Sequence, residues 1–324
     1  MDPTAPSPLK TFLPEIKVVG AGGGGGNVIA RMIRSGIEGV QLIACNTDSQ
    51  ALRATRADHQ LLLGRKITGG RGAGSHAELG RKAALESEED LAELLDGAEM
   101  VFLAAGLGGG TGTGASPVIS RIARERANAL TVAVVTLPFK FEGKRRMSVA
   151  KDGLAALRGE ADIVLVIPND RLLTVSSRTV SMVEAFQLAD SVLVDVIQGI
   201  ADLITHAGLI NVDLSDVRTV MEYRGGAVIG KGVASGEDRL ISAADKAIHN
   251  PLMGSVDLSG AKGILVHVMG GPDLALMEVH EAMEAIANLA GRDANVIFGA
   301  TTRADLGGDV SVVLIVTGLE EPEP

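Results

Sequence analysis

Aromatic residues, cysteine and positive charge are scarce in this sequence, and each shortage excludes a class of protein. Only 2% of the residues are aromatic, so a hydrophobic core must be built from aliphatic side chains. Cys45 is the single cysteine, which excludes an internal disulfide and fits a reducing compartment. The formal net charge of −10 leaves no general attraction for nucleic acid or for an anionic membrane surface.

Long uncharged hydrophobic runs are missing as well. The most apolar long segment, residues 181–205, contains four carboxylates, at Glu184, Asp190, Asp195 and Asp202. A bilayer core does not accept four carboxylates in one span. Residues 1–14 are rich in proline and lack the charged-then-apolar pattern of a signal peptide. We therefore expect a soluble, cytoplasmic protein without membrane insertion. Residues 1–14 are expected to form a disordered arm.

The residues that are abundant indicate an α/β protein. Glycine accounts for 41 of the 324 residues, and the length predicts about two domains. Short apolar runs predict strands at residues 16–19, 40–45, 100–105, 130–136 and 163–167. Helical spacing of apolar residues lies between them, at residues 27–37, 115–127 and 145–157. This alternation is typical of a parallel sheet covered on both faces, with ligands at the carboxyl ends of its strands.

The second half of the chain has a different pattern. Residues 181–205 predict one long helix whose broad apolar surface indicates burial between two domains. Beyond it, helices are expected at residues 235–247 and 273–289, and strands at 263–269, 295–298 and 310–316. These elements predict a smaller mixed α/β domain.

Two glycine-rich segments follow predicted strands. Residues 22–26 are five consecutive glycines ahead of a helix expected to begin at Asn27, and residues 108–114 read GGGTGTG ahead of another helix. The start of a helix offers free N–H groups and a partial positive charge, and glycine lets an anion approach the backbone closely. The two segments together could hold several phosphates of one nucleotide, although the first could also be only a flexible turn.

Two familiar nucleotide motifs do not fit. The P-loop needs Gly-Lys followed by Ser or Thr, and neither Lys144 nor Lys231 is followed by one. The dinucleotide fold needs an acidic residue near the end of the second strand, which here ends at Asn46 with Asp48 slightly too late. The first glycine segment alone would still allow a nicotinamide-dependent oxidoreductase, so this alternative stays open.

Several carboxylates and histidines have ordinary explanations when taken singly. Asp213 and Asp216 lie three residues apart at a predicted helix start, where the spacing favours an N-cap and a first-turn acid. Asp190 alone would be a solvated helix carboxylate. The six histidines form no metal-binding pattern, so no metal site made of protein ligands is expected.

The GGGTGTG segment resembles the signature of the tubulin/FtsZ GTPase family, and the similarity to the FtsZ proteins of bacterial cell division covers about residues 15–318. It includes IKVVGAGGGGGN at 16–27, NTDSQAL at 46–52, GRGAG at 70–74, PFKFEGKRR at 138–146, IPNDRLL at 167–173, GLINVDLSDV at 208–217 and GPDLALMEV at 271–279. The resemblance implies a GTP-binding domain at 15–180, a central linking helix at 181–206, a GTPase-activating domain at 207–318 and a disordered tail at 319–324.

The resemblance also implies the residues of a guanine nucleotide site. The phosphates and ribose would be lined by Gly23, Gly24, Gly25, Gly26, Asn27, Asn46, Gly108, Gly109, Gly110, Thr111, Gly112 and Thr113. Ala73 and Gly74 would sense the γ-phosphate. The remaining contacts would come from Pro138, Glu142, Arg146, Asn169, Phe186 and Asp190. Phe186 would stack on the base, and the Asp190 carboxylate suits guanine, which presents two N–H donors where adenine does not.

The catalytic residues implied by the resemblance are Asp213, Asp216 and Asn211. The two acids would orient the attacking water on the GTP of a neighbouring subunit, with Asn211 positioning them. The implied function is a cytoskeletal GTPase of the cell-division ring that polymerises head to tail and converts GTP to GDP and phosphate. Mg²⁺ is expected with the nucleotide, and the main partner is a second copy of the chain.

The sequence departs from the family at two places. FtsZ proteins usually continue with a linker and a short peptide that docks onto membrane tethers, whereas this sequence stops at Pro324. Division proteins and tethers are therefore open as partners, and so is a paralogue that shapes something other than a septum. Ser191 stands where the family often has Asn or Asp, which would alter contacts to the base slightly.

Overall fold

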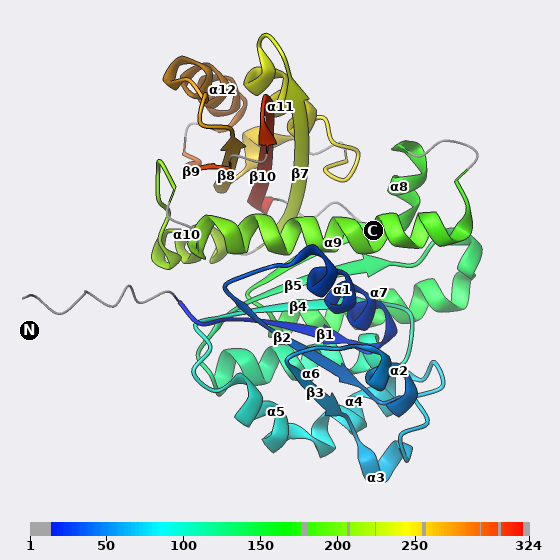
Figure 1. Cartoon of the computed structure of the whole chain (residues 1–324). Helices are drawn as coiled ribbons and strands as arrows, with labels where there is room; N and C mark the ends of the chain where they lie inside the picture. Colours follow the sequence, from blue (N-terminus) through cyan, green and yellow to red (C-terminus); the bar gives the residue numbers. More distant parts are fainter. Residues whose placement is uncertain are drawn as a thin grey trace, which may run out of the picture.

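The computed structural model describes residues 14–175, 180–205, 208–223, 225–254, 257–291, 293–303 and 306–319. Two α/β units lie on either side of the long helix α9 (Met182–Thr205), which crosses the middle of Figure 1. The predicted arm, apart from Pro14, and residues 320–324 of the predicted tail lie outside the described residues. Leu319 belongs to a strand and is 5% exposed, so the structure does not begin a tail there.

The first unit is built on a parallel sheet, as predicted. Its strands are β1 (Ile16–Ala21), β2 (Val40–Asn46), β3 (His59–Leu62), β4 (Met100–Gly106), β5 (Leu130–Leu137) and β6 (Ile163–Pro168). They lie in the order β3-β2-β1-β4-β5-β6. Their near-continuous aliphatic runs fit burial on both faces. The five predicted strands are confirmed, and only the short, half-exposed β3 was not foreseen.

Helices cover both faces of this sheet. The remaining helices of the unit are α1 (Gly22–Ser35), α2 (Ser49–Ala54), α3 (Arg65–Thr68), α4 (Ala77–Glu86), α5 (Glu88–Leu95), α6 (Thr111–Glu125), α7 (Lys144–Glu160) and α8 (Asn169–Val175), with a 3-10 turn η1 at Lys140–Glu142. Ile16 and Val18 of β1 pack in one core with α1 and α9, whereas Val19 and Ala21 pack in another with α6. This alternation follows from the two-residue period of a strand.

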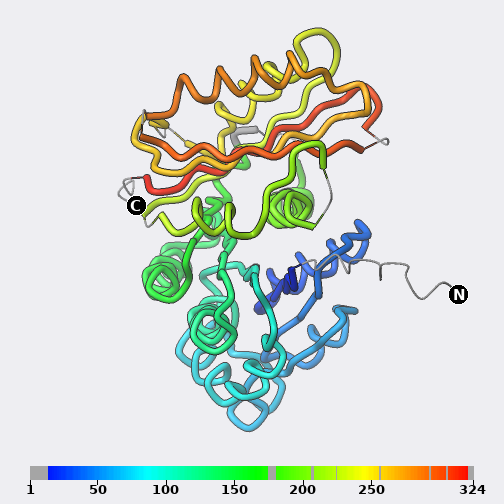
Figure 2. The backbone as a smooth tube through the Cα atoms, turned by 90° about the vertical axis from the view of Figure 1, so that its left-hand side faces the viewer, coloured from blue at the N-terminus to red at the C-terminus, as the bar shows by residue number. Residues whose placement is uncertain are grey.

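The second unit is a smaller mixed α/β layer, also as predicted. It contains α10 (Leu214–Met221), β7 (Gly226–Ser235), α11 (Arg239–Ile248), a 3-10 turn η2 (Leu258–Gly260), β8 (Gly263–Gly270), α12 (Leu276–Leu289), β9 (Asn295–Thr302) and β10 (Asp309–Leu319). The strand order is β7-β10-β8-β9, with β10 antiparallel to both of its neighbours. A single pair, Leu165↔Ala227, joins this sheet to β6 of the first. Figure 2 shows it on the other side of α9 from the first sheet.

One helix of the second unit was predicted to start too early. Residues 235–247 were expected to be helical, but β7 runs to Ser235 and α11 begins at Arg239. The three glycines of β7 hide its strand pattern, because glycine has low strand propensity. The structure explains two of them: a Cβ on Gly230 or Gly232 would collide with a backbone carbonyl of α11.

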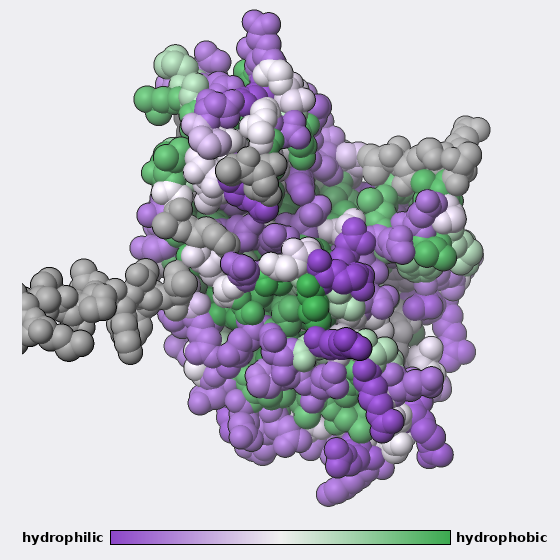
Figure 3. Space-filling view, in the orientation of Figure 1, coloured by the Kyte–Doolittle hydropathy of each residue, from purple (hydrophilic) through white to green (hydrophobic). Residues whose placement is uncertain are grey.

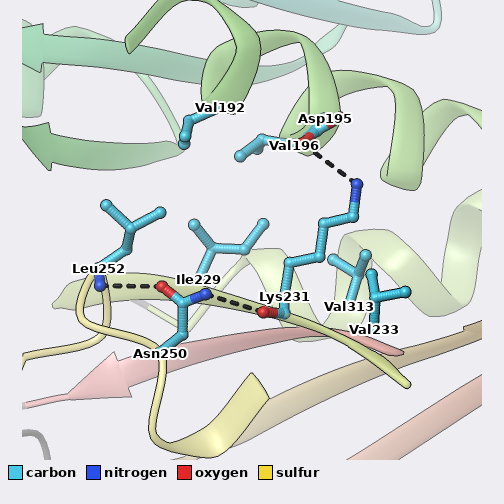
Figure 4. Close-up of a pocket in the computed structure, with 9 residues that line it drawn as sticks. All are labelled: Val192, Asp195, Val196, Ile229, Lys231, Val233, Asn250, Leu252 and Val313. Atoms are coloured by element: carbon cyan, nitrogen blue, oxygen red, sulfur yellow. Dashed lines mark hydrogen bonds and ion pairs between the residues drawn. The ribbon is translucent and has the colours of Figure 1, made fainter. Parts of the chain in front are cut away.

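Helix α9 is buried between the two units, as its broad apolar surface predicted. Ile197 and Ile200 share one core with Ile16 of the first sheet and Ile315 of the second. A cavity of about 220 Å³ remains between α9 and β7 (Figure 4). At its edge, Lys231 of β7 forms an ion pair of 3.1 Å with Asp195 of α9. The helix therefore couples the two units through aliphatic packing and an ion pair.

Candidate nucleotide site

Two helices begin side by side at the carboxyl ends of strands β1 and β4, and neither has a side-chain cap. Helix α1 begins at Gly22 rather than at the predicted Asn27, and α6 begins at Thr111 rather than after the glycine segment. A Cβ added to Gly22 would lie 2.8 Å from the backbone nitrogen of Gly112. The glycines therefore form two adjacent first turns whose free N–H groups suit a polyphosphate.

The glycines of these turns have two different structural roles. A Cβ on Gly23 or Gly109 would meet nothing within 4 Å, so their backbone is open to a ligand. By contrast, a Cβ on Gly25 would collide with the carbonyl of Ala104, and one on Gly112 would lie 2.6 Å from the carbonyl oxygen of Gly106. Gly25 and Gly112 thus allow the helices to pack on the sheet.

This difference predicts opposite effects for two Gly→Ala variants of helix α1. Gly23→Ala should keep or slightly raise thermal stability, because alanine favours a helix by about 1 kcal/mol, yet weaken GTP binding at least tenfold. Gly25→Ala should lower stability by roughly 1–3 kcal/mol through overpacking. Thermal unfolding and a fluorescent-nucleotide titration measure both. Full GTP affinity in folded Gly23→Ala would exclude Gly23 from the phosphate site.

The hydroxyl groups of the second glycine segment are already engaged within the protein. Thr111 Oγ1 lies 2.6 Å from Thr47 Oγ1, and Thr113 Oγ1 accepts a bond of 2.8 Å from the Gly108 N–H. Both threonines are buried. Thr113 therefore shapes the turn. Thr47 was missed by the sequence reasoning, although its place directly after β2 was a signal that could have found it.

The predicted γ-phosphate loop packs against the second glycine turn. A Cβ on Gly110 would lie 2.8 Å from Ala73 Cβ, and the Ala73 carbonyl accepts from the His76 N–H at 2.9 Å. Gly74 is exposed in the left-handed conformation (φ 54°) that glycine tolerates. On the same side, Asn46 ends β2 and its side-chain oxygen accepts from the Asp48 N–H at 3.1 Å. The structure thus brings Ala73 and Gly74 to the turn.

Three further predicted residues gather at Gly108. A Cβ on Gly108 would lie 2.8 Å from Arg146 Cγ and 3.3 Å from Pro138 Cγ. Arg146 forms an ion pair of 3.1 Å with Glu142, whose other oxygen accepts from the Phe139 N–H at 2.8 Å. These contacts fix the segment after β5 against the glycine turn, where a ribose would follow the phosphates.

Of the expected base-binding residues, Phe186 and Asp190 lie in the first half of α9, and Asn169 begins α8. Phe186 is 37% exposed, and its ring meets Phe139 edge-on at 5.3 Å, which leaves area for stacking. Asn169 is buried, yet its side-chain oxygen finds no donor among the described residues. A buried polar atom without a partner is rare and fits a group that awaits a ligand.

Asp190 has the electrostatics of a ligand-binding carboxylate. Burial raises its pKa from an ordinary 3.8 to about 6, while the charges of Arg31 and Arg34 on α1 oppose the rise. A half-desolvated carboxylate without a strong partner gains from meeting two N–H donors. The guanine edge offers that pair of donors.

The predicted catalytic residues lie at the opposite end of α9. In Figure 1, α10 stands at the left end of α9 and α8 at the right. Asp213 caps α10 and accepts from the Asp216 N–H at 2.8 Å, while Asn211 accepts from the Gly208 N–H at 2.7 Å. The part of α9 from Asp190 to Thr205 rises by 15 residue-to-residue steps, which span about 22 Å. The structure therefore does not bring Asp213 to the nucleotide residues of its own chain.

The described residues contain neither a cluster of metal ligands nor a membrane-spanning helix. No group of three or more His, Cys, Asp or Glu side chains in that part of the chain is placed to hold a metal ion. None of the helices in the described ranges combines the length and the apolar character needed to cross a membrane.

A parallel sheet with two open, glycine-lined helix starts at its carboxyl edge defines a nucleotide-binding α/β protein. The sequence pattern of the tubulin/FtsZ family GTPase domain matches residues 15–177, and that of the FtsZ family C-terminal domain matches residues 225–320. The chain belongs to the tubulin/FtsZ family and is a GTPase that binds GTP and GDP.

Solved structures agree with this assignment. An FtsZ dimer from M. jannaschii is 44% identical with a TM-score of 0.91, and the match covers 96% of this chain and 90% of that one. A mutant of the same FtsZ is also 44% identical, with a TM-score of 0.90 and coverage of 95% and 92%. CetZ2 from Haloferax volcanii, solved as a GTPγS-bound protofilament, is 25% identical, with a TM-score of 0.78 and coverage of 94% and 93%.

Proposed function

We propose that this GTPase polymerises head to tail and hydrolyses the GTP of one subunit with the acids of the next. The observation that carries the proposal is the length of α9, which extends about 22 Å from Asp190 to Thr205, ahead of the loop at residues 208–213. In a head-to-tail contact, the second subunit's Asp213 end meets the first subunit's nucleotide end. Such a contact is open and generates filaments. The GTPγS-bound protofilament of CetZ2 supports this arrangement.

The two ends of each subunit would have different roles in hydrolysis. At the nucleotide end, the first turns of α1 and α6 hold the phosphates, and Asp190 and Phe186 hold the guanine. At the other end, Asp213, Asp216 and Asn211 orient the attacking water. Phosphoryl transfer depends on positioning and charge stabilisation, so small polar residues suffice. A Mg²⁺ ion carried by the phosphate oxygens would offset their negative charge.

Charge supports the same pairing of ends. The nucleotide end presents four exposed cations after β5, at Lys140, Lys144, Arg145 and Arg146. The other end presents Asp213 and Asp216, both exposed. Opposite charges on two surfaces speed their encounter and suppress wrong pairings. In a chain with a net charge of −10, this local positive cluster favours one orientation of self-association.

We further propose roles for the two units and for the polymer. Residues 15–180 form the GTP-binding domain, residues 181–206 link the units and add Phe186 and Asp190 to the site, and residues 207–318 activate the neighbour's GTP. The polymer would act in the cytoplasm as a cell-division scaffold of the Z-ring type. Division proteins and membrane tethers would be its further partners. These roles rest on family membership.

Concentration dependence tests interface catalysis. The GTPase rate per subunit should be near zero in dilute protein and rise steeply above a threshold, because only contacting subunits are complete. Phosphate release measured over a 100-fold dilution series, with light scattering on the same samples, gives both quantities. A rate per subunit that stays constant across the series would contradict the proposal.

A further inference from the structure

Two buried threonine hydroxyl groups meet beside the second glycine turn. Thr47, which follows β2, and Thr111, which begins α6, bring their Oγ1 atoms within 2.6 Å of each other. Figure 3 shows a hydrophilic surface over α3 at the bottom of the view, but Thr47 beneath it is 0% exposed, whereas Thr111 is 9% exposed. Because solvent does not reach Thr47, its hydroxyl group depends on partners within the protein.

The number of hydroxyl hydrogens decides which threonine donates. The pair has two O–H groups and uses one of them, so the other still needs an acceptor. Neither hydroxyl group meets a further acceptor in the part of the chain that the structure describes. If Thr111 were the donor, the O–H of the fully buried Thr47 would stay unsatisfied, which costs free energy. The favoured arrangement therefore has Thr47 donating to Thr111, and it leaves the Thr111 O–H for a ligand.

The Thr111 hydroxyl group lies where the two glycine-lined helix starts meet. A Cβ added to Gly22 of α1 would lie 3.3 Å from Thr111 Cβ and 2.8 Å from the backbone nitrogen of Gly112. The Thr111 O–H thus joins the free N–H groups of both first turns. Hydrogen-bond donors of this kind are strongest when the acceptor is charged, as a phosphate oxygen is.

The backbone of Thr47 holds a second part of the site. Its carbonyl accepts from the Gly72 N–H at 3.0 Å, and Asp48 pairs with Arg71 in an antiparallel bridge. The segment after β2 and the loop at residues 70–74 are therefore zipped together. Thr47 connects this loop, through its carbonyl, to the first residue of α6, through its hydroxyl group.

The strand order places this connection far from the residues expected to bind the base. The carboxyl edge of the sheet runs β2-β1-β4-β5-β6. Thr47 follows β2 and Asn169 follows β6, so four strand spacings, about 19 Å, separate them. The two glycine turns follow β1 and β4, between these limits. A nucleotide with its base near Asn169 and its phosphates on the turns therefore directs its last phosphate toward the Thr47 side.

We propose that Thr47 is a positioning residue for the terminal phosphate of GTP. Its hydroxyl group fixes Thr111 so that the Thr111 O–H donates to an oxygen of that phosphate, and its carbonyl holds the loop at residues 70–74 beside the same turn. Thr47 itself is buried and does not touch the nucleotide. This role rests on the proposed function and deepens it, because it names a residue that distinguishes GTP from GDP.

The variant Thr47→Val removes the hydroxyl group and keeps the shape of the side chain. In protein too dilute to assemble, we expect GTP affinity to fall about tenfold, as for a lost hydrogen bond to a charged group, and GDP affinity to change less than about twofold. Thr47→Ser keeps the hydroxyl group and should restore GTP affinity. Competition against a fluorescent nucleotide measures each affinity.

The matched control is Thr131→Val. Thr131 is also 0% exposed, and its hydroxyl group donates to the Ala129 carbonyl at the amino end of β5, away from the site. Its loss should leave both affinities unchanged. Three results would overturn the role of Thr47: unchanged GTP affinity in Thr47→Val, equal losses of GTP and GDP affinity, or a Thr47→Ser chain as weak as Thr47→Val.

A variant cycle tests the direction of the hydrogen bond without any nucleotide. Thr111→Val should lower the unfolding temperature, because it leaves the buried Thr47 O–H without an acceptor. Adding Thr47→Val should recover most of that loss, since both partners are then apolar. The double variant should bind GTP no more weakly than Thr111→Val, because the Thr47 hydroxyl group acts through Thr111. Lack of recovery, or a further loss of GTP affinity, would contradict the proposed arrangement.

Failure of the proposed function is recognised by a different measurement. A GTPase rate per subunit that stays constant on dilution contradicts interface catalysis, whereas the affinities of dilute Thr47→Val decide the role of Thr47 independently. Conversely, wild-type GTP affinity in Thr47→Val together with a rate that rises with concentration overturns the role of Thr47 and leaves interface catalysis supported.

Discussion

An equimolar mixture of Asp213→Ala and Asp190→Ala chains should hydrolyse GTP, although each variant alone should be nearly inactive. The Asp213→Ala chain binds GTP but offers no water-orienting acid to its neighbour. The Asp190→Ala chain binds GTP poorly but keeps Asp213. When the second docks on the first, one complete site forms, and in randomly mixed filaments about one junction in four is complete.

The expected effect is large. Loss of a group that stabilises or orients the transition state typically lowers turnover about 10²–10³-fold, so Asp213→Ala alone should fall near background. The mixture should recover up to about a quarter of the wild-type rate for random pairing. Phosphate release measures it. Suppose that Asp213→Ala binds GTP, Asp190→Ala binds it poorly, and the mixture still releases no phosphate. The acids then do not act across the contact.

Asp190→Asn should exchange guanine specificity for xanthine specificity. An amide donates where a carboxylate accepts, and xanthine carries an oxygen where guanine carries its amino group. GTP binding should weaken roughly 10–100-fold, because one charge-assisted bond is worth about 1.5–3 kcal/mol. XTP should bind the variant better than GTP. Competition against a fluorescent nucleotide measures both affinities.

The matched control is Asp195→Asn, on the same helix in an ion pair with Lys231. It should leave the preference for GTP unchanged. The pH profile adds a second readout: burial raises the pKa of Asp190 to about 6, so wild-type GTP affinity should be nearly full above about pH 7 and fall as the pH drops through 6 and the carboxyl group protonates. Asp190→Asn should lack that fall. A variant that still prefers GTP would exclude Asp190 from base recognition.

Much of the fold followed from the sequence because aliphatic runs and helical spacing are local signals. Five of the six strands of the first sheet and the burial of α9 were predicted correctly. The first turn of α1 was not, because consecutive glycines have low helix propensity and their helical form depends on packing of Gly25 against β4. Strand β7 was missed for a similar reason. Gly230 and Gly232 have low strand propensity, and they occur there because only glycine leaves room for α11.

Only part of the candidate site could be predicted from local sequence patterns. The glycine segments indicated phosphate binding by position alone, whereas Asp190 and Asp213 were indistinguishable from ordinary helix carboxylates. Helix α9 places Asp190 at the nucleotide end and Asp213 at the opposite end. No local sequence pattern predicts the direction in which this helix runs. The buried Arg239 carried no sequence signal, since its partners Asp273, Glu278 of α12 and Gly308 lie 34 to 69 residues away and meet it only after the second sheet forms.

In the proposed polymer, where each subunit's acids act on its neighbour's GTP, helix α9 also determines what happens at the two tips. Because it keeps each nucleotide remote from its own acids, a chain of linked subunits has one fewer working junction than it has nucleotides. One tip always carries a GTP that no neighbour can attack, and the other carries acids with nothing to act on. The two tips are therefore chemically unequal from the first dimer onward, and short polymers keep a larger share of uncleaved GTP than long ones.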